Sequence, residues 1–187
     1  NGIQMSETTT ERPRLRDIGV SICELPPGPQ NAITDVDGVR VGQVTVWHGD
    51  GELRPGVGPA RTGVTVILPH DGNLFLARVP AAFYQFNGFW KCVGIEQIEE
   101  LGVLETPIAL TSTLSVGRVA DALISHAISQ TPEIGISMAT VNPFVGECND
   151  GWLNDIQGRH VSEADVLAAI ASASSGPVQE GAIGAGT

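Results

Sequence analysis

Two strand-like segments in the first third of the chain constrain the fold most. Residues 62–69 read Thr-Gly-Val-Thr-Val-Ile-Leu-Pro, an almost wholly apolar, β-branched run that is typical of a strand covered on both faces. Residues 40–46 alternate apolar and polar side chains, which predicts a half-buried strand after the turn residues 35–38. Residues 47–61, rich in Gly and Pro, predict a loop between them. The chain is therefore expected to build a sheet.

The remaining elements are predicted from spacing. We expect strands at residues 74–79 and 82–86, forming a meander, and at residues 107–111 and 136–141. A short helix should end at Gly102, a long one should follow the apolar stripe of residues 116–127, and a capping box formed by Ser162 and Asp165 should open a helix over 162–174. Because the strands are grouped, without regular β-α-β alternation, the pattern favours an α+β fold with helices packed on a mixed sheet.

Composition excludes several classes of protein. The 187 residues suit one domain, which we place at residues 18–187, after a polar N-terminal arm at residues 1–17 that is expected to attach to a partner subunit. The net charge of −11 argues against a nucleic-acid partner, and no apolar run approaches the roughly 20 residues of a membrane span. Three cysteines without C-x-x-C favour a reducing compartment, the cytoplasm, with the periplasm left open. Isolated histidines predict no metal and no cofactor.

Cys148 is the one candidate nucleophile that the residues themselves offer. The chain has no G-x-S-x-G motif, so a serine hydrolase of the α/β type is excluded. A cysteine nucleophile needs a lowered pKa, whereas the neighbouring carboxylates of Glu147 and Asp150 would raise the pKa of Cys148. We therefore interpret Cys148 as structural.

The stretch VGECNDGWLNDI, residues 145–156, admits two readings. It is either a solvated acidic loop whose Asn and Asp side chains bond their own backbone, or a ligand loop in which a carboxylate meets a cationic group and Trp152 forms an apolar wall or donates its N–H. Composition alone ranks them equally. The terminal glycines of residues 181–186 reverse the order of a dinucleotide fingerprint, so they predict close backbone approach rather than a phosphate site.

Five segments in order carry a resemblance to a known family: PQNAITDVDGVRVG (29–42), RTGVTVILPH (61–70), ETPIALTSTLSVG (105–117), TVNPFVGECNDGWLNDI (140–156) and EGAIGAGT (180–187). Together they resemble the DmpA-type L-aminopeptidase/D-esterase and β-peptidyl aminopeptidase family. The resemblance implies an αββα sandwich like that of DmpA and ornithine acetyltransferase. It also implies a precursor that cleaves itself into α and β chains, and a homo-oligomer, expected to be a tetramer, of αβ pairs.

The same resemblance implies an aminopeptidase or amidase that acts on short peptides, amides or esters. Its nucleophile would be the serine at the N-terminus of the β chain, formed by cleavage. No residue here matches that serine, so this chain is expected to be part of an α chain and inactive by itself.

The resemblance assigns two residues. Glu147 matches the acidic residue that holds the free amine of the substrate. Trp152 matches a position that is Tyr in some members, where its hydroxyl stabilises the oxyanion; an indole lacks that hydroxyl, so a pocket wall is the safer role. Two alternatives stay open: a self-processing acyltransferase like ornithine acetyltransferase, and a non-catalytic member of the fold.

Overall fold

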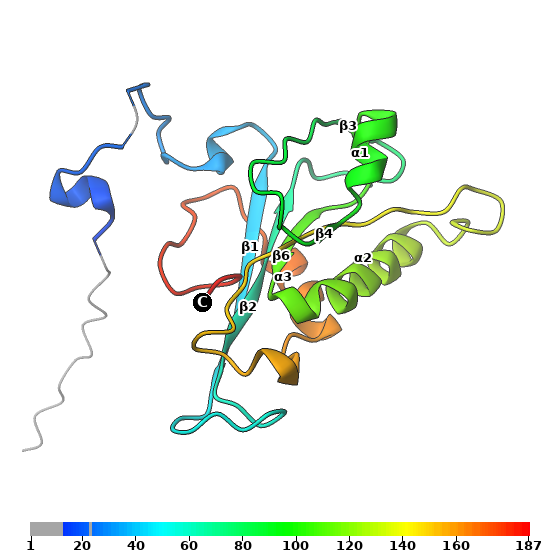
Figure 1. Cartoon of the computed structure of the whole chain (residues 1–187). Coiled ribbons are helices and arrows are strands. Elements are labelled where there is room, and N and C mark those ends of the chain that lie inside the picture. Colours follow the sequence, from blue (N-terminus) through cyan, green and yellow to red (C-terminus); the bar gives the residue numbers. More distant parts are fainter. Residues whose placement is uncertain (1–12, 23) are drawn as a thin grey trace, which may run out of the picture.

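A five-stranded mixed sheet organises the computed structural model, which describes residues 13–22 and 24–187. Its strand order is β1-β2-β6-β7-β4. β1 (Arg40–His48) and β2 (Ala60–Leu68) pair antiparallel along their whole length, with Arg40 opposite Leu68 and His48 opposite Ala60 (Figure 1). The two strands predicted first are therefore confirmed, and each is slightly longer towards the connecting loop.

The other half of the sheet contains a crossover that the sequence pattern did not suggest. β6 (Ile108–Thr111) and β7 (Phe144–Glu147) pair parallel, and the 15-residue helix α2 (Val116–Gln130) lies between them in the chain. Parallel neighbours need such a crossover. β4 (Cys92–Val93) adds an antiparallel edge to β7. The mixed sheet is confirmed, and within it β6, α2 and β7 form a β-α-β unit.

Smaller elements surround this sheet. α1 (Ile95–Leu101) ends at Gly102, which adopts a φ of 66° as the predicted C-terminal glycine. α3 (Glu163–Ser172) begins after Ser162, whose hydroxyl and the Asp165 carboxylate form the predicted capping box. β3 (Val79–Pro80) and β5 (Val103–Leu104) form a separate two-stranded sheet. Four 3-10 turns complete the described chain: η1 (Leu15–Ile18), η2 (Ile33–Asp35), η3 (Thr113–Ser115) and η4 (Ile156–Gly158).

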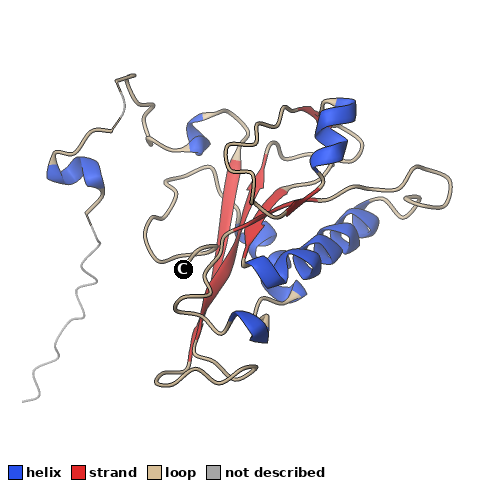
Figure 2. Cartoon of the chain, viewed as in Figure 1, coloured by secondary structure: helices blue, strands red, loops and turns tan. Residues whose placement is uncertain are grey.

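Helices α2 and α3 cover one face of the sheet (Figures 1 and 2). The main core lies there: Val64 and Val66 of β2, Val145 of β7 and Leu123 of α2 are fully buried in one cluster. Burial of each such side chain contributes about 1.5–3 kcal/mol. This apolar layer fixes which face of each strand turns inward, because neighbouring residues of a strand point to opposite faces.

The opposite side of the sheet, which we term the outer face, is covered only in part. The C-terminal segment crosses it, lying on the other side of β1 and β2 from the helices in Figure 1. Gly184 N–H donates to Thr45 Oγ1 (2.8 Å) and Ala185 N–H to Thr65 Oγ1 (3.1 Å). Elsewhere on this face Trp47 keeps 59% of its surface exposed. The close approach predicted for the terminal glycines is confirmed.

Three predicted strands are not formed. Residues 74–78 form a turn, because the Asn73 side chain accepts hydrogen bonds from Phe75 N and Leu76 N. Residues 82–86 have no regular structure, so the meander is wrong, and only β3 remains of it. Residues 136–138 belong to a tight turn. The backbone N–H groups of Ile136, Ser137 and Met138 all donate to Glu133 O, and residues 139–141 have no regular structure. At residues 74–78 and 136–138, hydrogen bonds to nearby side-chain and backbone groups form in place of hydrogen bonds between strands.

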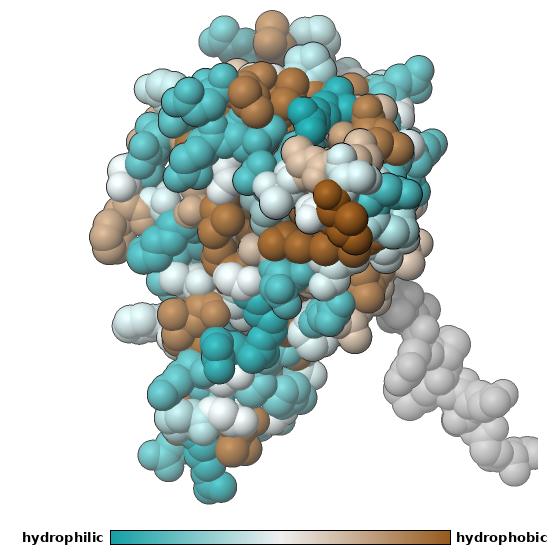
Figure 3. All heavy atoms as spheres, turned by 90° about the vertical axis from the view of Figure 1, so that its right-hand side faces the viewer, coloured by the Kyte–Doolittle hydropathy of each residue, from teal (hydrophilic) through white to brown (hydrophobic). Residues whose placement is uncertain are grey.

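The N-terminal arm falls mostly outside the described residues, which begin at 13. Arg14 forms an ion pair with Glu180 and donates to Gln30 O (2.9 Å), so the segment preceding β1 contacts the C-terminal segment. Within the described chain, no helix has the length and apolar character that crossing a bilayer requires. The surface shown in Figure 3 is hydrophilic with several apolar patches between.

The contact between β1 and α3 yields a first prediction. A Cβ at Gly42 would collide with the backbone carbonyl of Ala169 in α3. Gly42→Ala should therefore destabilise the full-length protein by about 1–3 kcal/mol. Gly117→Ala, where nothing lies within 4 Å of the new atom, should be neutral or stabilise by about 0.4–1 kcal/mol. Urea unfolding of both variants provides the comparison; equal midpoints would contradict the packing of α3 on β1.

Candidate functional site

Glu147 stands at the end of β7, opposite Thr111 at the end of the parallel strand β6. Val145, two residues earlier, is fully buried against α2, so Glu147 lies on the same side of the strand. Only 9% of its side chain is exposed. A carboxylate at such depth requires compensating partners.

Lys91 contacts one oxygen of Glu147, and the other oxygen is enclosed by protein. Lys91 Nζ lies 3.3 Å from Glu147 Oε1, whereas Oε2 is buried and makes no well-formed hydrogen bond with any described residue. Burial works to raise the pKa of Glu147, but the nearby Thr113 hydroxyl and the Lys91 backbone and ammonium outweigh it and hold the pKa below its ordinary value of 4.5. Glu147 is therefore a charged carboxylate whose buried Oε2 makes no well-formed hydrogen bond with the described residues.

Lys91 holds Glu147 only loosely. Its ammonium is half exposed, lies over the Phe89 ring at 3.8 Å from the centroid and also bonds to Phe89 O at 3.3 Å. A distance of 3.3 Å is long for a charge-assisted hydrogen bond, and an ion pair open to water is worth about 0–1 kcal/mol. A competing cation can therefore share or displace this contact at little cost.

Trp90 fixes the backbone beside Glu147. Its indole N–H donates to Glu147 O at 2.6 Å, and its ring stacks parallel to Phe83 with centroids 5.9 Å apart. The ring also covers Gly146, where any Cβ would collide with it. The sequence analysis missed Trp90 and Lys91. The nearest signal was the aromatic run of residues 83–90, of which only the first part was interpreted, as a strand at residues 82–86.

Asp150 is a buried anchor rather than a turn residue. Its carboxylate accepts hydrogen bonds from Thr62 Oγ1 (2.5 Å) on β2, Ser112 Oγ (2.9 Å) after β6, and Asn154 Nδ2 (3.1 Å) in its own loop. Only 7% of the residue is exposed. The loop after Glu147 is thereby tied to two neighbouring strands.

Asp155 anchors the far end of the same loop. The carboxylate accepts from Gly56 N (2.7 Å) and Gly158 N (3.1 Å), and His160 Nε2 lies 2.9 Å from it. Burial works to raise the pKa of Asp155, but His160 and these amides hold it below its ordinary value. The His48 and His160 rings meet edge to face. Within residues 13–22 and 24–187, no group of three His, Cys, Asp or Glu side chains could hold a metal ion.

The other residues of the loop divide as follows. Burial, followed by the charges of Asp150 and Glu147, raises the pKa of the Cys148 thiol, which fits a structural cysteine. Gly151 N–H bonds to Asn149 Oδ1 at 3.1 Å, the expected Asx turn. Trp152 is 94% exposed, so its indole is open to solvent in this structure.

The loop and the C-terminal glycines lie together. A Cβ at Gly186 would sit 3.7 Å from Cys148 Cβ, and Leu153 and Thr187 line one cavity of about 320 Å³ beside Trp47 and Arg61. Arg61 lies over the Trp47 ring at 4.1 Å. Three of the five segments that carry the family resemblance, residues 61–70, 140–156 and 180–187, thus meet at one edge of the outer face.

The contact with Lys91 makes a titration prediction. Removing the ammonium removes a stabiliser of the charged form, so Lys91→Met should raise the pKa of Glu147, whereas Lys91→Arg should keep it low. A ¹³C NMR titration of the Glu147 carboxyl carbon measures this. An unchanged pKa in Lys91→Met would show that Lys91 does not govern the charge of Glu147.

Known proteins resemble this chain along most of its length. Beta-peptidyl aminopeptidase BapA of Sphingosinicella microcystinivorans is 42% identical over 178 residues, which are 95% of this chain and 43% of that protein. The PH0078 protein of Pyrococcus horikoshii OT3 superposes with a TM-score of 0.89 at 48% identity, over 92% of this chain and 49% of that one. The chain thus spans less than half the length of these relatives.

A second similar structure bears on the fold. It is the L-aminopeptidase D-Ala-esterase/amidase of Ochrobactrum anthropi, described as a prototype of the serine aminopeptidases and a variant of the Ntn hydrolase fold. Its TM-score is 0.80 at 37% identity, over 93% of this chain and 48% of that one. The match to peptidase family S58 covers residues 31–187, which include the sheet, Glu147 and the terminal glycines. The chain belongs to peptidase family S58, the family of the DmpA- and BapA-type aminopeptidases.

Proposed function

We propose that the full-length protein is an aminopeptidase or amidase that releases N-terminal residues from short peptides, amides or esters, and that Glu147 binds the free amine of the substrate. The observation that carries this proposal is the state of Glu147: charged, nine-tenths buried and with Oε2 unpartnered. An ammonium group has three donors and satisfies such an oxygen directly. The names of the relatives as aminopeptidases support the same reaction class.

The reacting atom would come from a segment outside these 187 residues. The hydroxyl of an N-terminal serine on a β chain attacks the substrate carbonyl, the bond to the leaving amine breaks, and water then hydrolyses the acyl-enzyme. The serine would be exposed by self-cleavage of the precursor. This chain would contribute the amine anchor and the frame that fixes its position.

The outer face supports an αββα sandwich in the full-length protein. Trp47 and other side chains of this face remain partly exposed, although sheets normally bury both faces or present a polar one. A second sheet with its own helices would cover it. Large exposed apolar side chains such as Phe86 (93%) and Ile136 (87%) support further assembly into an oligomer, a tetramer of αβ pairs.

Trp152 would complete the substrate site only in that assembly. It is almost fully exposed here, yet it belongs to the loop anchored by Asp150 and Asp155, so the position of its backbone is fixed. A neighbouring chain packed against this loop would convert the indole into a pocket wall with one N–H donor.

The amine anchor is tested by Glu147→Gln in the full-length protein. The variant retains the shape of the side chain but loses the charge, which is worth about 1.5–3 kcal/mol in a hydrogen bond to an ammonium. The kcat/KM for free-amine substrates should fall about 10–100-fold. The kcat/KM for N-acylated substrates should be unchanged, because they carry no ammonium.

The control is self-cleavage, followed by mass spectrometry of the purified protein. Glu147→Gln should still yield two polypeptides, the second beginning with Ser. An equal loss on free and N-acylated substrates would reject the amine anchor. A wild-type protein that stays one uncleaved polypeptide would instead reject the N-terminal nucleophile.

A further inference from the structure

A second cavity lies at the other end of the sheet from Glu147. It has a volume of about 250 Å³ and opens between α2, α3 and the turn at residues 71–75; we term it the α2–α3 pocket. Pro107, just before β6, and Leu68, at the end of β2, line it, whereas Glu147 pairs with Thr111 at the opposite end of β6. The pocket is therefore separate from the candidate site.

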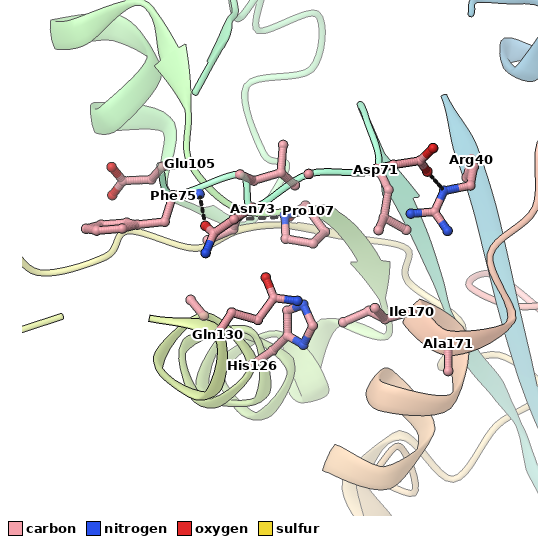
Figure 4. A pocket seen from close by; sticks show the side chains of 15 residues that line it. Arg40, Asp71, Asn73, Phe75, Glu105, Pro107, His126, Gln130, Ile170 and Ala171 are labelled. Carbon is pink, nitrogen blue, oxygen red and sulfur yellow. Dashed lines mark hydrogen bonds and ion pairs between the residues drawn. The ribbon is translucent and has the colours of Figure 1, made fainter. Parts of the chain in front are cut away.

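Its body is apolar. Phe75 and Leu68 are buried and form part of the lining, and Pro107 and Ile170 face each other across the space (Figure 4). The volume is below the 300–1,000 Å³ typical of pockets for drug-sized ligands, so a molecule of only a few carbon atoms suits it.

Polar groups without protein partners border this space. The His126 ring and the Gln130 amide, both on α2, make no side-chain hydrogen bond with any described residue, and Figure 4 shows them side by side at the pocket. Burial lowers the pKa of His126, so the ring is neutral near pH 7 and offers one donor and one acceptor. Across the pocket, Arg40 Nε lies 2.5 Å from Asp71 Oδ1, and the terminal nitrogens of Arg40 bond to no described group.

Both carboxylates that line the pocket already form ion pairs with arginine side chains. Glu105, 2% exposed, accepts from Asn142 N at 2.7 Å and pairs with Arg78 Nε at 3.2 Å. Asp71 is matched by Arg40. No unpaired negative charge remains in the pocket to attract a cation. The free donors are those of Arg40, a residue whose planar guanidinium favours carboxylates.

We propose that the α2–α3 pocket binds a small monocarboxylic acid, whose carboxylate meets the terminal nitrogens of Arg40 and whose short apolar chain lies between Pro107 and Ile170. His126 and Gln130 bond to any polar atom at the far end of that chain. The site does not depend on the aminopeptidase reaction, so the two proposals stand or fall separately.

The test is a ligand titration of the full-length protein by NMR with three probes of different charge: butyrate, butylammonium and inorganic phosphate. Butyrate should shift the His126 ring resonances and saturate, whereas the other two should not. Arg40→Gln should weaken butyrate binding about tenfold, the loss expected for a charge-assisted bond. Arg54→Gln, the same change at an exposed arginine outside the pocket, should leave it unaltered.

A second variant keeps the test decisive if Arg40→Gln fails to fold. Ala171 lines the pocket from α3 and is exposed, so Ala171→Leu should fill the space and reduce butyrate binding without removing any charge. Absence of butyrate binding to the wild type, equal binding of butylammonium or phosphate, or butyrate binding that neither variant weakens would each overturn the proposal. Aminopeptidase activity should be retained in Ala171→Leu, which separates this result from the function of Glu147.

Discussion

The buried carboxylate of Asp150 is the interaction on which the arrangement of the candidate site depends. Its two oxygens take hydrogen bonds from three segments: Thr62 on β2, Ser112 after β6 and Asn154 further along the loop. Hydrogen bonds to a buried charge contribute about 1.5–3 kcal/mol each, and leaving such a charge without partners costs more. The chain just after Glu147 is therefore fixed relative to two strands, which holds Glu147 in place at the end of β7.

The C-terminal glycines depend on the same frame. They reach Cys148 by crossing the outer face, where the hydroxyls of Thr45 and Thr65 hold Gly184 and Ala185. A Cβ at Gly63 would collide with the backbone of Gly184, and a Cβ at Gly184 would collide with Thr65 Oγ1. Glycine is required here by close backbone approach as well as by the φ of 63° at Gly184. The glycines of this segment therefore contact both the sheet and the loop after β7.

Much of the fold was predictable where the signal is local. The hairpin of β1 and β2, the end of α1 at Gly102 and the capping box at Ser162 all depend on residues within a few positions of one another. Strand β7 and the role of Asp150 were missed, because the partners of Asp150 at residues 62 and 112 lie far away in the sequence. The strand predicted at residues 136–141 failed because periodicity does not reveal the bonds that gather on Glu133 O. Glu147 was selected by the family resemblance. That its buried Oε2 has no hydrogen-bond partner among the described residues could be learned only from the structure.

The most direct measurement is a crystal structure of the full-length protein bound to a non-hydrolysable substrate analogue that carries a free N-terminal amine. The account predicts the ammonium nitrogen within about 2.7–3.2 Å of Glu147 Oε2, with Lys91 displaced or moved aside. An analogue whose ammonium binds elsewhere, leaving Oε2 of Glu147 without a partner, would contradict the account.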